Sequence, residues 1–265
     1  MSDIEFQNSL VPASKNKGQE TYQKQAKAIS IFPFRDGYYR IFSQTNLALA
    51  NSLAALQPKD SSPSAKTQTQ IYTLIQQSIN AGRVATSIAP HTSINWQNLS
   101  SIYRSLIGFG QNAESFAIAT QQQSLLLDPN NPQQYIVLGS IYYQLGLWEN
   151  AQNQFQIAVN LKSDFANAHY NLGHALENKN DLNNALAQYQ IVKALVVSDQ
   201  NSLKQITSEI ETLERKIEGK ETATTPGIPP STVPPLNLST PSAQLPPQNP
   251  PIKIPPPATA TQSSR

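Results

Sequence analysis

Residues that commonly act in catalysis or metal binding are scarce in this 265-residue sequence. It contains no cysteine and three histidines, His91, His169 and His174. The lack of cysteine excludes thiol nucleophiles, disulfides and zinc-ribbon ligand sets. His169 and His174 are five positions apart, whereas two metal ligands on one helix face lie four apart. We therefore expect no metal site, and we expect His169 to pack in a core.

Catalytic and phosphate-binding motifs are also missing from the sequence. There is no G-x-S-x-G elbow to present a nucleophilic serine, and no G-x-x-x-x-G-K-[ST] loop to hold phosphate. The dinucleotide-binding pattern G-x-G-x-x-G does not occur either. No pair of acidic residues stands isolated in an apolar stretch, as a general acid–base pair would. We predict that the chain is not an enzyme and carries no cofactor.

The charge balance argues against a nucleic-acid partner, and the lack of a long apolar run argues against direct membrane insertion. Nineteen Lys and Arg residues oppose seventeen Asp and Glu residues, which gives a net charge of +2. Nucleic-acid-binding proteins usually show a strong positive excess. No apolar run reaches the roughly 18 residues of a membrane span, and the first residues lack a signal-peptide pattern. We expect a soluble protein with a cytoplasmic location as the default.

A repeat of 34 residues is the strongest pattern in the sequence. Eight positions recur in two copies, with Leu138, Gly139, Tyr142, Trp148, Ala151, Phe155, Ala158 and Leu161 followed by Leu172, Gly173, Leu176, Leu182, Ala185, Tyr189, Val192 and Leu195. The spacing of apolar residues predicts two amphipathic helices per copy, joined by a short turn. We expect Gly139 and Gly173 to face Ala151 and Ala185 where the paired helices approach closely. One such hairpin cannot bury its apolar stripe alone, so hairpins are expected to stack.

The two copies, YIVLGSIYYQLGLWENAQNQFQIAVNLK and HYNLGHALENKNDLNNALAQYQIVKAL, resemble tetratricopeptide repeats, or TPRs. The resemblance implies an all-α fold in which stacked helix hairpins form a right-handed α-solenoid. A third copy carries five extra residues in the turn between its helices. We predict a disordered N-terminus at 1–18, degenerate TPR-like helices at 19–92, and TPRs at 93–131, 132–165 and 166–198.

Residues 199–219 are predicted to form a C-terminal capping helix. Apolar residues recur there at spacings of three and four, through Leu203, Ile206, Ile210, Leu213 and Ile217. Such a stripe either covers the exposed end of a solenoid or pairs with a second copy in a coiled coil. We favour the cap and keep self-association through this stripe as the alternative.

The last segment, residues 220–265, differs in composition from the rest of the chain. It holds 13 of the 20 prolines and no aromatic residue. Proline fixes φ and removes a hydrogen-bond donor, so this segment is predicted to be disordered and to favour polyproline II. It acts either as a spacer or as a ligand for an aromatic groove, because Pro226–Pro229 and Pro247–Pro250 have PxxP spacing.

The TPR resemblance also implies a binding site, because TPR proteins generally hold peptides in the concave groove formed by the first helix of each repeat. The corresponding positions here are Gln97, Ser101, Arg104, Gln133, Ile136, Ser140, Tyr143, Gln144, Asn167, Tyr170, His174 and Asn178. This lining is largely neutral and lacks the Lys, Asn and Arg clamp with which chaperone co-factor TPRs hold a peptide carboxylate. We predict a non-catalytic scaffold that binds an extended peptide or protein segment.

A narrower resemblance covers about residues 20–219. This stretch is similar to TPR regions of uncultured reduced-genome bacteria, which often follow membrane segments related to O-antigen ligases or polymerases. The similarity implies an alternative function, that of a detached accessory domain in an envelope glycan assembly or ligase system. In that case we expect an extracytoplasmic location.

Overall fold

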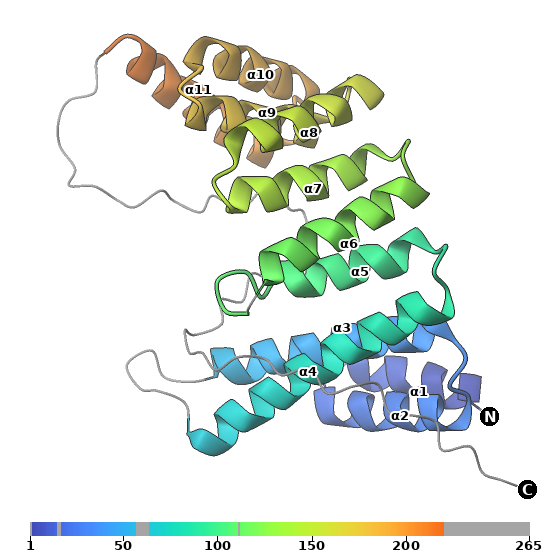
Figure 1. Ribbon diagram of the computed structural model, residues 1–265. Helices are drawn as coiled ribbons and strands as arrows, with labels where there is room; N and C mark the ends of the chain where they lie inside the picture. The colour runs from blue at the N-terminus through green and yellow to red at the C-terminus, as the bar shows by residue number, and fades with distance from the viewer. Residues whose placement is uncertain (1, 15–16, 57–63, 111, 220–265) are drawn as a thin grey trace, which may run out of the picture. The chain divides into compact units, whose positions relative to one another are not determined.

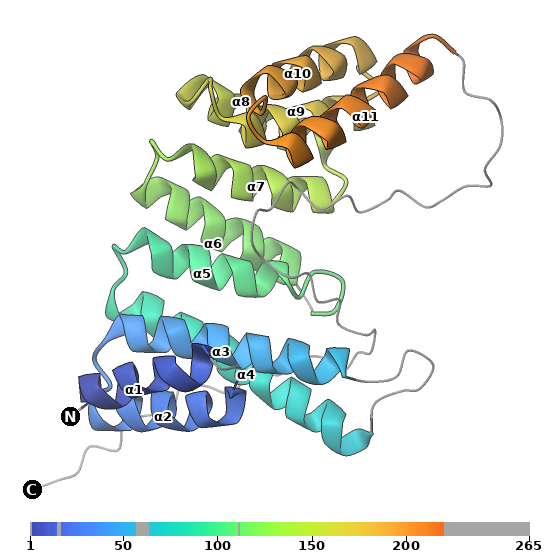
Figure 2. The same cartoon turned by 180° about the vertical axis from the view of Figure 1, so that it is seen from behind.

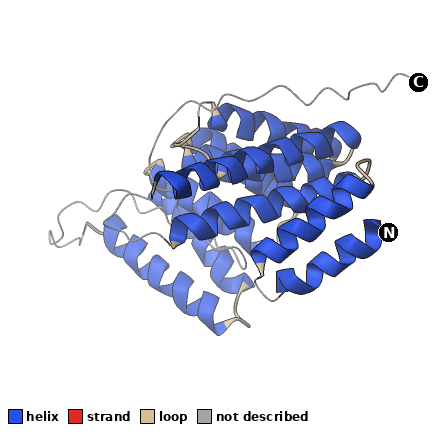
Figure 3. Cartoon of the chain, turned by 90° about the horizontal axis from the view of Figure 1, so that it is seen from below, coloured by secondary structure: helices blue, strands red, loops and turns tan. Residues whose placement is uncertain are grey.

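The computed structural model describes residues 2–14, 17–56, 64–110 and 112–219. These residues form helices and turns, with no strand among them (Figure 3). The helices are α1 Ser2–Ser14, α2 Gly18–Ile31, α3 Asp36–Ala55, α4 Ala65–Ile88, α5 Ser93–Arg104, α6 Ala113–Leu127, α7 Pro132–Gln144, α8 Trp148–Leu161, α9 Ala166–Asn178, α10 Leu182–Leu195 and α11 Gln200–Ile217 (Figure 1). The all-α fold of stacked hairpins predicted from the repeat is therefore confirmed.

Neighbouring helices pair along the chain. Extensive packing joins α1 with α2, α3 with α4, α7 with α8, and α9 with α10. The chain divides into two compact units, of which the first contains residues 1–90 and 101–115 and the second contains 91–100 and the helical residues from 116 onward. We describe each unit by itself.

The prediction of a disordered N-terminus at 1–18 is wrong for residues 2–14, because they form helix α1 of the first unit. The ring of Phe6 stacks on that of Tyr38 with 4.4 Å between centroids. Lys27 on α2 forms an ion pair with Glu5 at 2.6 Å. The isolated sequence of α1 has little amphipathic periodicity, so these contacts with other helices are what stabilise it. Helix α1 thus packs on α2, the first of the helices within the predicted range 19–92.

Buried polar side chains explain why the repeat pattern fades in the first unit. Gln25, Ser43, Asn46 and Ser78 are all buried. The Ser78 hydroxyl on α4 donates to the Ser43 carbonyl on α3 at 2.8 Å, and so ties the two helices together. Polar residues in core positions break the apolar periodicity on which sequence reading depends.

The two best repeats, in the second unit, pack around their glycines. A Cβ on Gly139 would lie 2.5 Å from the Phe155 ring, and one on Gly173 would likewise clash with the Tyr189 ring. The expectation that these glycines face Ala151 and Ala185 is therefore corrected. The aromatic ring of the second helix packs against the first helix at the glycine, and only glycine leaves room for it.

The turns within these two repeats also correspond. Gly146 has a φ of 73° and Asn180, 34 positions later, has a φ of 62°. In both turns the amide of the next residue bonds back to the first helix, from Leu147 to the Tyr142 carbonyl and from Asp181 to the Leu176 carbonyl, each at 2.9 Å. Glycine and asparagine tolerate this left-handed conformation, which ends a helix.

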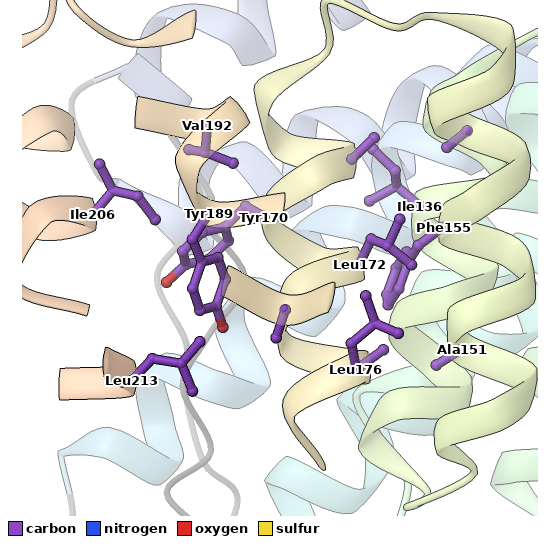
Figure 4. Packing of buried hydrophobic residues seen from close by; sticks show 14 of the residues in the cluster. Ile136, Ala151, Phe155, Tyr170, Leu172, Leu176, Tyr189, Val192, Ile206 and Leu213 are labelled. Carbon is purple, nitrogen blue, oxygen red and sulfur yellow. The ribbon is translucent and has the colours of Figure 1, made fainter. Parts of the chain in front are cut away.

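Helix α11 completes the core of the second unit. Ile206, Ile210 and Leu213 are buried against Tyr189 and the rest of the cluster on α8, α9 and α10 (Figure 4). Leu203 is half-buried and Ile217 is 37% exposed. The apolar stripe of α11 therefore packs on other helices of the same chain, as a capping helix would. Self-association through this stripe stays a prediction.

Residues 220–265, with both PxxP spacings, and most of the long inter-helix loop, residues 57–63, lie outside the described residues.

Candidate functional site

Three of the residues predicted to line a groove are buried. Ile136, Ser140 and Tyr170 are 3%, 8% and 0% exposed. They lie on the first helices of their repeats, α7 and α9. In this structure these side chains belong to the contact between successive helices, so a peptide does not reach them. The groove prediction therefore has to be narrowed to the remaining residues.

The remaining predicted residues of the second unit are accessible to different degrees. Gln133, Gln144 and Asn178 are exposed, and Gln97, Tyr143 and Asn167 are half-buried. All six are uncharged. The first unit contains the other two predicted residues, the exposed Ser101 and the half-buried Arg104. Burial lowers the pKa of the Arg104 guanidinium.

Tyr143 is the aromatic member of the accessible set and lies in the last turn of α7. Its ring meets the ring of Trp148, the first residue of α8, in a T-shaped contact with 4.8 Å between centroids. The Asn178 amide on α9 donates to the Tyr143 hydroxyl at 2.8 Å and to the His174 carbonyl at 2.9 Å. Burial raises the pKa of Tyr143. The site thus presents an uncharged phenol, an indole and an amide from two adjacent repeats.

His174 lies below this surface in a polar cluster closed by α11. The Tyr189 hydroxyl is 2.9 Å from His174 Nδ1 and 3.2 Å from Glu177 Oε2. On the other side of the ring, His174 Nε2 lies 3.8 Å from Glu209 Oε2 on α11. Desolvation lowers the pKa of His174, against the opposing effects of Glu209 and Glu177. Burial therefore favours the neutral imidazole, at a position predicted to face a ligand.

Tyr170 links the same cluster to α11. Its hydroxyl donates to Glu209 Oε1 at 3.0 Å, while the Gln205 amide donates to the Tyr170 oxygen at 3.2 Å. Burial, with the nearby Glu209 charge, raises the pKa of Tyr170 well above its usual value. Sequence reasoning missed Glu209 and Gln205, because they come from the capping helix and not from a repeat. The only sequence feature that could have indicated Gln205 and Glu209 is that each directly precedes an apolar position of α11, Ile206 or Ile210.

His169 has the core role expected for it. It is 5% exposed, and its two ring nitrogens lie 2.7 Å from the Gln188 side-chain oxygen and 2.9 Å from the Ser163 carbonyl. Within the described residues, no group of three or more His, Asp or Glu side chains is arranged to hold a metal ion. Over the same residues, no helix is both long and apolar enough to cross a membrane.

The geometry of the two best repeats defines the structural class of the protein. Antiparallel helix hairpins with a 34-residue repeat, a glycine under an aromatic ring and a left-handed turn form a helical-repeat protein. A family model described as TPR repeat matches residues 139–180. No curated protein sequence matches the chain.

Solved structures agree with this class. TTC0263, a thermophilic TPR protein in Thermus thermophilus, gives a TM-score of 0.54 at 14% identity over 78% of this chain and 98% of that one. MamA from Desulfovibrio magneticus RS-1 gives 0.57 at 13% identity over 75% and 97%. YrrB, described as a TPR protein with an unusual peptide-binding site, gives 0.51 at 13% identity over 77% and 90%. Residues 139–180 therefore contain a TPR repeat, and the fold of the chain is similar to that of solved TPR proteins.

Proposed function

We propose that the chain is a protein-interaction scaffold whose second unit binds an extended segment of a partner protein. The observation that carries the proposal is the uncharged accessible set on the first helices α7 and α9, formed by Gln133, Tyr143, Gln144, Asn167 and Asn178. The TPR fold supports it, as does the peptide-binding site described for YrrB, which has the same fold.

The chemistry of these side chains favours a neutral ligand. Amide groups both donate and accept hydrogen bonds, so they suit the alternating carbonyl and N–H groups of an extended backbone. Tyr143 adds an aromatic surface of low conformational entropy. The nearby ammonium of Lys179 is 2.7 Å from the Gln152 side-chain oxygen and 3.9 Å from Glu149 Oε1, both on α8. The accessible set itself offers no cation to a peptide carboxylate.

The test is an array of uncharged extended peptides probed with the full chain, followed by titration calorimetry on the strongest binder. Truncating a central aromatic residue of a binding site removes about 1.4 kcal/mol or more, a tenfold loss of affinity. We therefore expect Tyr143→Ala to weaken binding about tenfold or more. Tyr143→Phe keeps the ring and should lose less.

Tyr72→Ala is the matched control. Tyr72 is a 37%-exposed tyrosine on α4 in the first unit, and its truncation should leave the affinity unchanged. Equal affinity of the Tyr143→Ala variant and the parent chain, with unchanged helix content by circular dichroism, would contradict the proposed site. The alternative of an accessory domain in a glycan assembly system stays a prediction from sequence.

A further inference from the structure

An aromatic surface lies at the turn between α7 and α8, and the proposed peptide site uses only part of it. It consists of Tyr143, Leu147 and Trp148, which we call the Tyr143–Trp148 patch. Leu147 is 45% exposed, and the two rings are half-buried. Within the described residues, the Tyr143 oxygen accepts a hydrogen bond from Asn178 and its own proton has no acceptor. The patch therefore combines ring faces with hydroxyl and indole donors.

This combination suits a polyproline II segment. Such a helix has no internal hydrogen bonds, so its carbonyls are open to donors, and its proline rings pack on aromatic side chains. The prolines also limit the entropy that is lost on binding. A ligand of this type carries no charge of its own, which matches the uncharged patch.

The chain contains a segment of this chemistry. Residues 220–265 hold 13 prolines, no aromatic residue, and only four charged residues, Lys220, Glu221, Lys253 and Arg265. Polyproline II advances roughly 3.1 Å per residue, so 46 residues in this conformation can span on the order of 100 Å. The segment is therefore long enough to dock on any part of the second unit.

The last turn of α11 contacts the helix that bonds to the patch. Lys216 Nζ, in the last turn of α11, lies 3.5 Å from Glu177 Oε1 on α9. The next residue, Asn178, donates to the Tyr143 hydroxyl. Gly219 then has a φ of 68°, which ends the helix and redirects the chain. In both views the end of α11 and the turn between α7 and α8 lie on the same side of the second unit (Figures 1 and 2).

We propose that the proline-rich segment 220–265 of the same chain is an intramolecular ligand of the Tyr143–Trp148 patch. This inference rests on the proposed function, since the patch shares Tyr143 with the proposed peptide site. Covalent attachment next to the patch gives the segment an effective concentration in the millimolar range. A partner must then displace the segment, so the chain regulates access to its own binding site.

Energy transfer from Trp148 to the segment tests the proposal in the full chain. The chain has two tryptophans, Trp96 and Trp148, and no cysteine. Trp96→Phe leaves Trp148 as the single donor, and Ser239→Cys gives a single thiol for an acceptor dye. We expect efficient transfer that falls when Pro226, Pro229, Pro247 and Pro250 are all changed to Ala, and also when Tyr143 is changed to Ala. Tyr72→Ala should leave the transfer unchanged.

Equal transfer in the parent, the Tyr143→Ala variant and the four-proline variant would overturn the proposal. So would a transfer that rises with protein concentration, because the ligand would then be the segment of a second copy. Circular dichroism of each variant shows whether the helices are intact, and Tyr143→Phe, which keeps the ring, should retain most of the transfer.

A competition experiment separates this inference from the proposed function. A synthetic peptide of residues 241–257, added to the full chain, is expected to bind about tenfold more tightly to the four-proline variant than to the parent, because the internal competitor is weakened. If a peptide binds in a Tyr143-dependent way but with equal affinity to both chains, the inference fails and the proposed function stands. If no peptide binds and no transfer is seen, both fail.

Discussion

Gly173 and Gly139 occupy the closest contact between the helices of their repeats. The aromatic rings of Tyr189 and Phe155 take the space in which a side chain would stand. Overpacking of a core typically costs about 1–3 kcal/mol. We expect Gly173→Ala to lower the free energy of unfolding by about that amount, as measured by urea denaturation of the full chain.

Gly37→Ala is the matched control for this change. At Gly37, in the first turn of α3, a new Cβ would find its nearest atom 4.0 Å away, at the end of the Arg40 side chain. Alanine also restricts the unfolded chain more than glycine does. This variant should therefore be as stable as the parent or about 0.5 kcal/mol more stable. Similar losses in both variants would show that the ring contact is not what requires glycine.

The pKa of His174 links the stability of the second unit to pH. Its surroundings are Glu177, Glu209, Tyr170 and Tyr189, from α9, α10 and α11. Because burial lowers the pKa in the folded state, the unfolded state binds the proton more readily. Stability from the neutral imidazole is therefore complete above the unfolded pKa, near 6.5, and is lost as the pH falls through the folded pKa.

We expect the parent to lose more stability than His174→Gln between about pH 7.5 and about pH 5.5, as measured by urea denaturation at each pH. Glu209→Gln should increase the loss, because it removes a charge that favours the imidazolium. An identical pH dependence in the parent and His174→Gln would show that this histidine does not titrate as described.

At the level of elements, α11 is an integral part of the second unit. Ile210 is 6% exposed and lies in the same core cluster as Tyr189 and Val192. Truncating a buried isoleucine to alanine typically costs about 2–5 kcal/mol. We expect Ile210→Ala to destabilise the unit by this amount and to increase hydrogen exchange in α11 first.

Ile217→Ala is the comparison for this variant. It changes the same residue type on the same helix, but Ile217 is 37% exposed, so the loss should stay below about 1 kcal/mol. If Ile210→Ala leaves stability unchanged but converts a dimer to a monomer in light scattering, the stripe joins two copies and α11 is not a cap.

Helix α1 forms because of tertiary contacts, since its own sequence does not specify an amphipathic helix. Helices of this length are marginal in water unless they pack against a partner. The Phe6 stack on Tyr38 and the Glu5 ion pair with Lys27 supply that packing. Neither contact is visible as a local pattern, because the partners lie far apart along the chain.

At the level of the whole molecule, the binding site depends on which side chains the stacking leaves accessible. The repeat register places Ile136, Ser140, Tyr170 and His174 on first helices, as expected from the sequence. Ile136, Ser140 and Tyr170 are buried, and the His174 side chain is only 15% exposed. In the last repeat, α11 contributes to this burial, because Glu209 contacts both Tyr170 and His174.

The sequence by itself determined the helical class, the 34-residue register and the turns at Gly146 and Asn180. These features depend on local periodicity and on backbone conformations that few residue types adopt. Only the tertiary structure decided that α1 is a helix, that the glycines face rings, and that α11 closes the polar cluster around His174. Burial and hydrogen bonding between distant segments depend on how the helices pack. Helix packing cannot be predicted from a local pattern of residues.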